Sequence, residues 1–436
     1  MQGNDDIEKC RTNDLLQSSA EDQQEAPPVD RPNFMSVFDR HMCYPFFIIL
    51  CKHLSIAEIV ALTRTCKKYA DLYQYLLPIQ WDVDRRLRRF VRDPNGFRSQ
   101  MAKSNALIVG SFVSQFFERT PRETSDLNIF VEGLERANSF QSYLLNEEGY
   151  TEIPSIREPF KVLKLLKISN HARTEREEEE CTTGPSRRKV RLFVDARTPV
   201  ETILENFCST IIVNFMSWNK AYSVFPLSTF VQYKGYQLGV NGHFASFLEI
   251  FLAYPLGRWN MQEIMCLEEK RLNHPIRTFR RVGDSFTWTI PFDTENVQWS
   301  KIPDYVLEYA CFQIESRYVM KHFDYKIFTY GYINRTLKYQ YLVNWDMQYF
   351  VRAKIDCLTA VEPREIDQSA KPVVSAGMTD YRKRSQPRVM AGWGGLISLD
   401  AEFPDWYSEW ERRIGDENKF PEFPEFSKGG FLVASS

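Results

Sequence analysis

Residues 106–131, with the sequence ALIVGSFVSQFFERTPRETSDLNIFV, decide how the rest of the chain is organised. An apolar run ends at Gly110-Ser111, and a segment with helical spacing of apolar residues follows over 112–119. A polar turn then leads through Ser-Asp-Leu-Asn into a second apolar run over 129–131. This order predicts a strand, a tight turn, a helix, a loop and a second strand.

The polar residues of this stretch suggest a phosphate and metal site. A glycine at a strand end lets the backbone approach a phosphate, and the N–H groups and the hydroxyl of Gly110-Ser111 can donate to its oxygens. Asp126 and Asn128 are two residues apart on a predicted strand, so their side chains point to one face. Two carboxylates in that arrangement hold Mg²⁺, but Asn128 offers only one neutral oxygen.

This pattern resembles the polymerase-beta-type nucleotidyltransferases, which carry Gly-Ser, then Asp-x-Asp, and a third carboxylate on a later strand. The resemblance implies a nucleotide-binding pair and a metal site at Gly110, Ser111, Asp126, Asn128 and Asp195. Asp195 ends a predicted strand over 190–195. It fits the N-cap region of the next predicted helix, 199–207, equally well. Both interpretations stay open.

Residues 45–81 carry helical patterns. Apolar residues recur at helical spacing from Phe46, and Ser55 with Glu58 forms a capping-box pattern. The region resembles an F-box, a three-helix module that contacts the Skp-type adaptor of a ubiquitin ligase. The resemblance implies an adaptor-binding surface at Pro45, Ile49, Leu50 and Leu54. The alternative is a helical cap that packs on its own domain.

A longer stretch, residues 106–226, is similar to a family of uncharacterised fungal proteins that join an F-box-like start to a degenerate nucleotidyltransferase-like region. Gly110-Ser111-Phe112, Ser125-Asp126-Leu127 and Phe225-Pro226 are among the positions that carry this resemblance. It implies an architecture and no particular activity.

Bulk composition narrows the class of protein. The chain has 436 residues, enough for two or three packed units, with an ordinary soluble mix of 43% hydrophobic and 26% charged residues. A net charge of -2 argues against a protein that coats nucleic acid. Nine cysteines without a CxxC pair indicate reduced thiols, and no apolar run is long enough to span a membrane. We therefore expect a cytoplasmic or nuclear protein.

The predicted fold class is α+β, with a mixed-sheet nucleotidyltransferase-like core between helical ends. The expected divisions are a disordered acidic segment 1–33, an F-box-like module 34–103, the α/β region 104–235, a mostly helical region 236–360, a linker 361–390 and a tail 391–436.

Three further elements are specific enough to test. An arginine-rich helix is predicted over 82–98, and a single helix over 302–322. In the tail, an aromatic stripe at helical spacing starts at Phe403 and ends at Trp410. It predicts a helix that packs back on the domain, with a partner-binding helix as the alternative.

These observations favour a non-catalytic intracellular adaptor or binding protein, with the F-box substrate receptor of a ubiquitin ligase as its specific form. Asn128 in place of a carboxylate is the residue that argues against catalysis. The alternatives are a Mg²⁺-dependent nucleotidyltransferase and a pseudoenzyme that binds nucleotide. Only these alternatives call for Mg²⁺ and a nucleotide as cofactors; the favoured function requires none.

Overall fold

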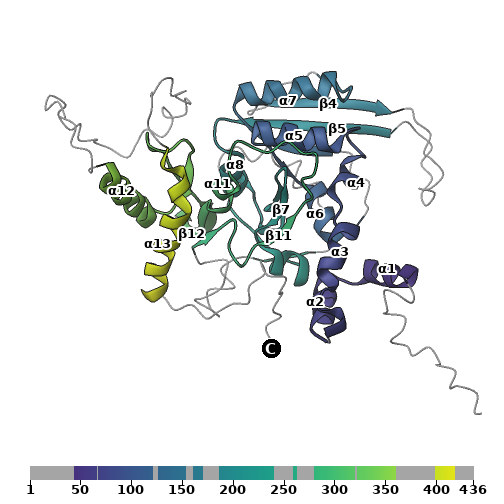
Figure 1. Cartoon of the computed structure of the whole chain (residues 1–436), viewed down its shortest axis with the longest axis horizontal. Helices are drawn as coiled ribbons and strands as arrows, with labels where there is room; N and C mark the ends of the chain where they lie inside the picture. The colour runs from purple at the N-terminus through teal and green to yellow at the C-terminus, as the bar shows by residue number, and fades with distance from the viewer. Residues whose placement is uncertain are drawn as a thin grey trace, which may run out of the picture. The chain divides into compact units, whose positions relative to one another are not determined.

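A computed structural model describes residues 44–65, 67–120, 126–153, 161–169, 186–239, 259–262, 279–319, 322–359 and 398–417 (Figure 1). The chain divides into two compact units, Met1–Leu54 and Ser55–Ser436, so the division falls inside the predicted 34–103 module. Both helices and a mixed sheet are present, which confirms the α+β class. The predicted segments 1–33 and 361–390 lie outside the described residues.

The described part of the first unit consists of helix α1, Tyr44–His53, and Leu54 directly after it. The second unit begins with α2 (Ile56–Thr65), the short helix η2 (Lys67–Tyr69) and α3 (Leu72–Gln80). The predicted capping box at the start of α2 is confirmed, because Glu58 N donates to Ser55 Oγ (3.3 Å) and Ser55 N donates to Glu58 Oε2 (2.5 Å). At the end of α3, Trp81 packs edge-on against Trp288 of a later strand.

The prediction of one helix over 82–98 is wrong. The structure has two helices here, α4 (Val83–Leu87) and α5 (Pro94–Ser104). The Asp82 side chain caps α4 by accepting from Arg85 N (2.9 Å). Pro94 begins α5, and a proline fits the first helical turn but not a helix interior.

The prediction for the opening stretch is confirmed. Strand β1 (Leu107–Val109) leads into α6 (Ser111–Glu118), and β2 (Asp126–Glu132) follows. Gly110 joins β1 to α6 with φ 91° and ψ −158°, a backbone region that side chains with a Cβ rarely adopt.

Within the described residues the main sheet has eight strands in the order β11-β7-β6-β1-β2-β5-β4-β3. The remaining strands of this sheet are β3 (Thr151–Ile153), β4 (Lys161–Ser169), β5 (Ser186–Asp195), β6 (Asn214–Met216), β7 (Lys220–Ser223) and β11 (Trp288–Pro291). β2 and β5 are parallel, whereas the other neighbours are antiparallel. The parallel pair fixes which residues of β2 and β5 lie side by side.

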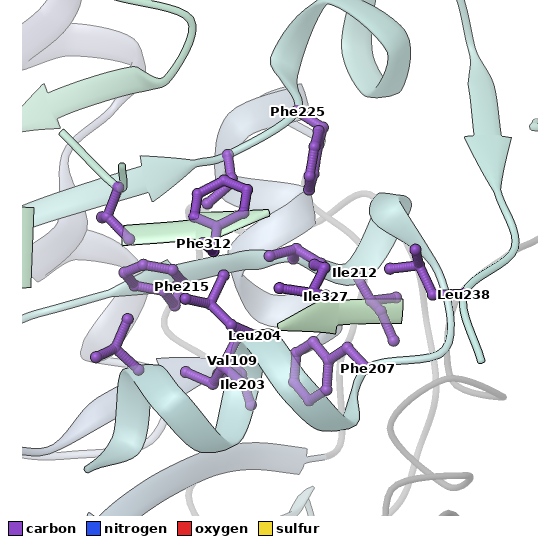
Figure 2. Packing of buried hydrophobic residues seen from close by; sticks show 14 of the residues in the cluster. Val109, Ile203, Leu204, Phe207, Ile212, Phe215, Phe225, Leu238, Phe312 and Ile327 are labelled. Carbon is purple, nitrogen blue, oxygen red and sulfur yellow. The ribbon is translucent and has the colours of Figure 1, made fainter. Parts of the chain in front are cut away.

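One apolar core covers a face of this sheet. Figure 2 shows Val109 and Phe215 of the sheet beside Leu204 and Phe207, with Phe312 from a later strand. Leu204 belongs to helix α8, Pro199–Asn206. Further helices of this unit are α7 (Leu134–Asn146), η3 (Thr210–Ile212) and the π-helix η4 (Leu227–Val231).

The expectation of a mostly helical region over 236–360 is wrong for its described residues. Strands are β8 (Lys234–Tyr236), β9 (Asn260–Gln262), β10 (Arg280–Arg281), β12 (Cys311–Val319), β13 (His322–Phe328), β14 (Tyr330–Tyr332) and β15 (Tyr341–Val343). The predicted helix over 302–322 is instead the five-residue α11 (Asp304–Glu308) followed by β12. Phe312 and Ile314 are both buried, a two-residue period that is typical of a strand.

The aromatic stripe of the tail packs back on the domain, as predicted. Helix α13, Phe403–Glu417, buries Phe403, Trp406, Tyr407 and Trp410 in a core that includes α12, Trp345–Thr359 (Figure 1). A Lys354–Glu409 ion pair (2.5 Å) joins the two helices.

The short helix η7, Leu399–Glu402, precedes α13. Asp400 of η7 is buried, and its carboxylate accepts four hydrogen bonds. The donors are the backbone N–H groups of Lys338 (2.7 Å) and Tyr339 (3.3 Å), the Tyr341 hydroxyl (2.8 Å) and the Ser398 hydroxyl. This carboxylate fixes the start of α13. In the part of the chain that the structure describes, no helix is both long and apolar enough to cross a membrane.

Candidate functional site

The predicted site residues Gly110, Ser111, Asp126 and Asn128 meet at one end of the main sheet. Val109, the last residue of β1, is paired with Asn128. Gly110 and Ser111 therefore continue alongside the first residues of β2, where Asp126 lies. The strand–turn–helix–strand arrangement thus places a Gly-Ser pair beside the two polar positions of β2, as the sequence predicted.

Asp195 does not belong to this group, so the predicted metal site of Asp126, Asn128 and Asp195 needs correction. Asp195 is paired with Glu132 at the far end of the parallel ladder, whereas Asp126 is paired with Lys189. Six residue steps of about 3.3 Å separate the two carboxylates by roughly 20 Å. The stacked rings of Phe130 and Phe193 lie between them on the ladder.

Asp195 is engaged elsewhere. Its carboxylate pairs with Arg197 (2.9 Å) and accepts from Thr202 Oγ1 of α8 (3.1 Å). Burial alone would raise the pKa of Asp195, but the hydrogen bonds and charge of Arg197 outweigh it, and the pKa lies below its usual value. The alternative interpretation, a role at the start of α8, agrees with these contacts.

The residue that the site brings in instead is Arg191, which sequence reasoning missed. Arg191 of β5 is paired with Asn128, and its guanidinium forms an ion pair with Asp126. The basic run that precedes Val190 was visible in the sequence. That β5 runs parallel to β2 in this register was not visible, and only this register places Arg191 beside Asp126.

These side chains are largely closed off from solvent. Asn128 is 2% exposed and Arg191 is 6% exposed, while Asp126 is half-buried. The Oδ1 atom of Asn128 is buried and has no hydrogen-bond partner. A buried amide oxygen without a donor costs about 1–3 kcal/mol, so this position is a weak point of the local packing.

The residues present do not fit the Mg²⁺ that the nucleotidyltransferase resemblance implies. Mg²⁺ needs hard anionic oxygens in octahedral geometry. Among the described residues Asp126, Asn128 and Arg191 at this end of the sheet, Asp126 is the one carboxylate, and it is already paired with a cation. Across the described ranges, no group of three or more His, Cys, Asp or Glu residues could hold a metal ion.

Lysines extend the basic character of the site. Lys189 of β5 is paired with Asp126 of β2, and Lys164 of β4 is paired with Arg191 of β5. Paired residues on neighbouring strands point to the same face of a sheet. Both lysines are half-buried, whereas Arg191 is 6% exposed.

Two glutamates of α8 lie near Asp195. Arg197 pairs with Glu205 (3.0 Å), and Gln340 donates to Glu201 (3.2 Å). Burial raises the pKa of Glu201 to about 7, and the neighbouring charge of Glu205 adds to that shift. Glu201 thereby joins α8 to Gln340, the residue before β15, through a carboxyl group whose pKa lies near neutral pH.

The predicted adaptor-binding residues all lie on or directly after α1. Ile49 is 53% exposed, while Leu50 and Leu54 are half-buried. Pro45 lies in the first turn of the helix. Phe46, which is 68% exposed, lies three residues before Ile49 on the same side of the helix.

Comparisons with known proteins give no assignment: no family model, no curated protein and no solved structure matches this chain.

Proposed function

We propose that this protein is a non-catalytic adaptor or binding protein whose helix α1 docks a Skp-type adaptor of a ubiquitin ligase. The observation that carries the proposal is the exposed apolar side of α1, where Phe46 and Ile49 lie one turn apart with half or more of each side chain in solvent. The opposite side of the same helix buries Phe47 and Cys51.

The energetics of α1 support a docking role. Burying an exposed large apolar side chain contributes about 1.5–3 kcal/mol. An amphipathic helix that presents apolar residues at i and i+3 suits an apolar groove on a partner. Phe46 and Ile49, with the half-buried Leu50 beside them, form such a surface, and it coincides with the positions that the F-box resemblance selects.

The nucleotidyltransferase-like sheet supports the non-catalytic part of the proposal. Among the described residues of its candidate site there is one carboxylate, Asp126, and the Arg191 guanidinium is paired with it. Asp195 is engaged with Arg197 at the other end of the ladder. A Mg²⁺-dependent nucleotidyltransferase is therefore less well supported, and we propose that the sheet serves as a scaffold.

The test is co-expression of the full chain with a fungal Skp-type adaptor, followed by co-purification. We expect a stable complex that Ile49→Asp abolishes. Leu134→Asp is the matched control, because Leu134 is also 53% exposed and lies on α7 in the second unit. The proposal would be refuted if the protein is folded but no complex forms. It would also be refuted if Ile49→Asp and Leu134→Asp reduce co-purification equally.

A further inference from the structure

We propose that a cavity in the second unit binds the amino-terminal residue of a peptide whose first side chain is short and aliphatic. The inference goes beyond the proposed function, and it does not depend on adaptor binding by α1. It rests on the lining of the cavity, which combines apolar walls, a carboxylate and a hydroxyl without a hydrogen-bond partner.

The cavity has a volume of about 50 Å³, and its lining comes from α5, β1, the β6–β7 turn, α8, α11 and β15. One water molecule needs roughly 10–15 Å³ of such volume, and a cavity of about 150 Å³ takes a benzene ring, so this space suits a short aliphatic side chain. Most of the lining is apolar, including Met101, Leu107, Val200, Leu307 and Leu342. Burial in the cavity therefore favours a small apolar group.

Asp304, the first residue of α11, contributes a half-buried carboxylate to this lining. Its Oδ2 atom accepts from Asn219 Nδ2 (2.7 Å) and pairs with the Lys220 ammonium (2.8 Å), so both contacts use one oxygen. The same ammonium also pairs with Glu308 (2.7 Å). Two carboxylates thus share one lysine, and the Oδ1 atom of Asp304 is available to the ammonium group of a ligand.

Thr198, which also lines the cavity, is the N-cap residue of α8. A threonine at this position normally accepts from a backbone N–H of the first helical turn. Here the side chain makes no capping hydrogen bond, and its buried Oγ1 atom has no partner among the described residues. A buried hydroxyl without a partner costs free energy, and a carbonyl oxygen of a ligand would remove that cost.

The start of α8 selects the kind of acceptor. The helix dipole and the N–H groups of a first helical turn attract an oxygen atom. Glu201 already places a carboxylate in this turn, which disfavours a second one. The best ligand therefore has an ammonium group for Asp304, a neutral carbonyl oxygen for Thr198 and a short apolar side chain. The first residue of a peptide has this composition, whereas a free amino acid carries a carboxylate in place of the neutral carbonyl.

An exposed indole lies next to the cavity. Trp299 is 73% exposed, and its ring packs against Trp218 of the lining with the ring centroids 5.8 Å apart. Tryptophan rings offer a large apolar contact area. This surface suits the residues that follow the first one, so we expect a peptide to bind more tightly than a single residue.

The experiment titrates the tripeptide valyl-glycyl-glycinamide into the full chain by calorimetry, with its N-acetylated form and free valine as comparison ligands. We expect saturable binding of the tripeptide and weaker binding of valine. Acetylation removes the ammonium group and should weaken binding at least about tenfold, as expected for loss of a charged hydrogen bond. Phenylalanine in place of the first valine should also weaken binding, because its ring is too large for the cavity.

Two variants test the polar groups of the lining. Thr198→Val removes the hydroxyl and keeps the shape of the side chain, so it should weaken binding about fivefold without lowering the thermal midpoint. Asp304→Asn should weaken binding about tenfold, while its amide oxygen still accepts from Asn219. Thr289→Val is the matched control, because Thr289 is a half-buried residue of β11 outside the cavity lining.

The inference would be overturned if the folded protein shows no saturable binding of the tripeptide, or if the acetylated form binds equally well. Equal affinity in Thr198→Val and Thr289→Val would also overturn it. Failure of the Skp-type complex to form would change none of these results, because the cavity belongs to the second unit.

Discussion

Replacing Arg98 by methionine should destabilise the second unit more than any surface substitution. Arg98 is 1% exposed, although it carries a full charge. Its Nη1 atom donates to both carboxylate oxygens of Asp84 (3.0 and 3.1 Å). Nε and Nη2 donate to the carbonyl oxygens of Trp218 (2.8 Å) and Asp293 (2.5 Å), respectively. One side chain thus joins α4, α5, the β6–β7 turn and the segment after β11.

The size of the effect follows from these partners. Removing one member of a buried ion pair typically costs 3–5 kcal/mol, because the other charge stays behind without compensation. Asp84 is about a quarter exposed, so water recovers part of that loss. The two carbonyl oxygens each lose a charged donor, worth about 1–3 kcal/mol if they stay dry. Together these terms give an expected loss of about 3–5 kcal/mol for Arg98→Met.

The assay is urea unfolding of the full chain at neutral pH, followed by circular dichroism and tryptophan fluorescence. Arg88→Met is the control, since Arg88 is exposed and its replacement should change the free energy of unfolding by less than about 0.5 kcal/mol. Asp84→Asn should fall between the two. A loss below about 1 kcal/mol in Arg98→Met would refute the reasoning that this arginine holds the four elements together.

Three further predictions concern single residues. The pKa of Glu201 is about 7 in the folded chain, against 4.5 for the unperturbed carboxyl group, so the folded chain binds a proton on Glu201 more tightly than the unfolded chain. Protonation of Glu201 therefore contributes fully to the free energy of unfolding below about pH 4.5, and this contribution is lost as the pH rises through 7. Glu201→Gln should therefore reduce the loss of stability between pH 4.5 and 8 and stabilise the protein by about 1–3 kcal/mol at pH 8. Thermal midpoints that fall as steeply with pH in the variant as in the original chain would contradict this. Asp400→Ala should cost about 2–4 kcal/mol because four donors lose their acceptor, and limited proteolysis should then release the tail helix. Asp405→Ala, at an exposed position of the same segment, should change neither result. Gly110→Ala should lower the free energy of unfolding by about 1–3 kcal/mol through backbone strain at φ 91°, and an unchanged thermal midpoint would show that the turn relaxes.

Local patterns in the sequence predicted local structure well. The run from Ala106 to Val131 gave β1, the Gly110 turn, α6 and β2 in the right order, because apolar period, glycine and polar turn all lie within a few residues of one another. The α2 capping box and the aromatic stripe of α13 were correct for the same reason.

Pairing between strands that are distant in the chain could not be predicted from the sequence. Arg191 interrupts the apolar run over 190–194 and Asp195 ends it, so from the sequence either residue could have faced Asp126. The choice depends on the parallel register of β5 against β2, which no residue near either strand encodes. Arg98 was missed in a similar way, because its partners Trp218 and Asp293 are distant in the chain.

The misread helix over 302–322 has a different cause. The short helix α11 supplies a helical start at Asp304. The strand that follows it does not alternate strictly, because Cys311 is buried as well as Phe312 and Ile314. A helix and a strand joined by two residues therefore resemble one long amphipathic helix.

The packing of α13 makes the tail an intramolecular ligand. Residues 360–397 connect it to α12, yet the contact itself depends on buried aromatic rings and the Lys354–Glu409 pair rather than on chain continuity. Tethering raises the local concentration of such a segment to the millimolar range, so even a modest interface stays formed. Cutting the chain between α12 and α13 would turn this contact into a bimolecular complex, and its dissociation constant would measure how much of the interface strength the tether supplies.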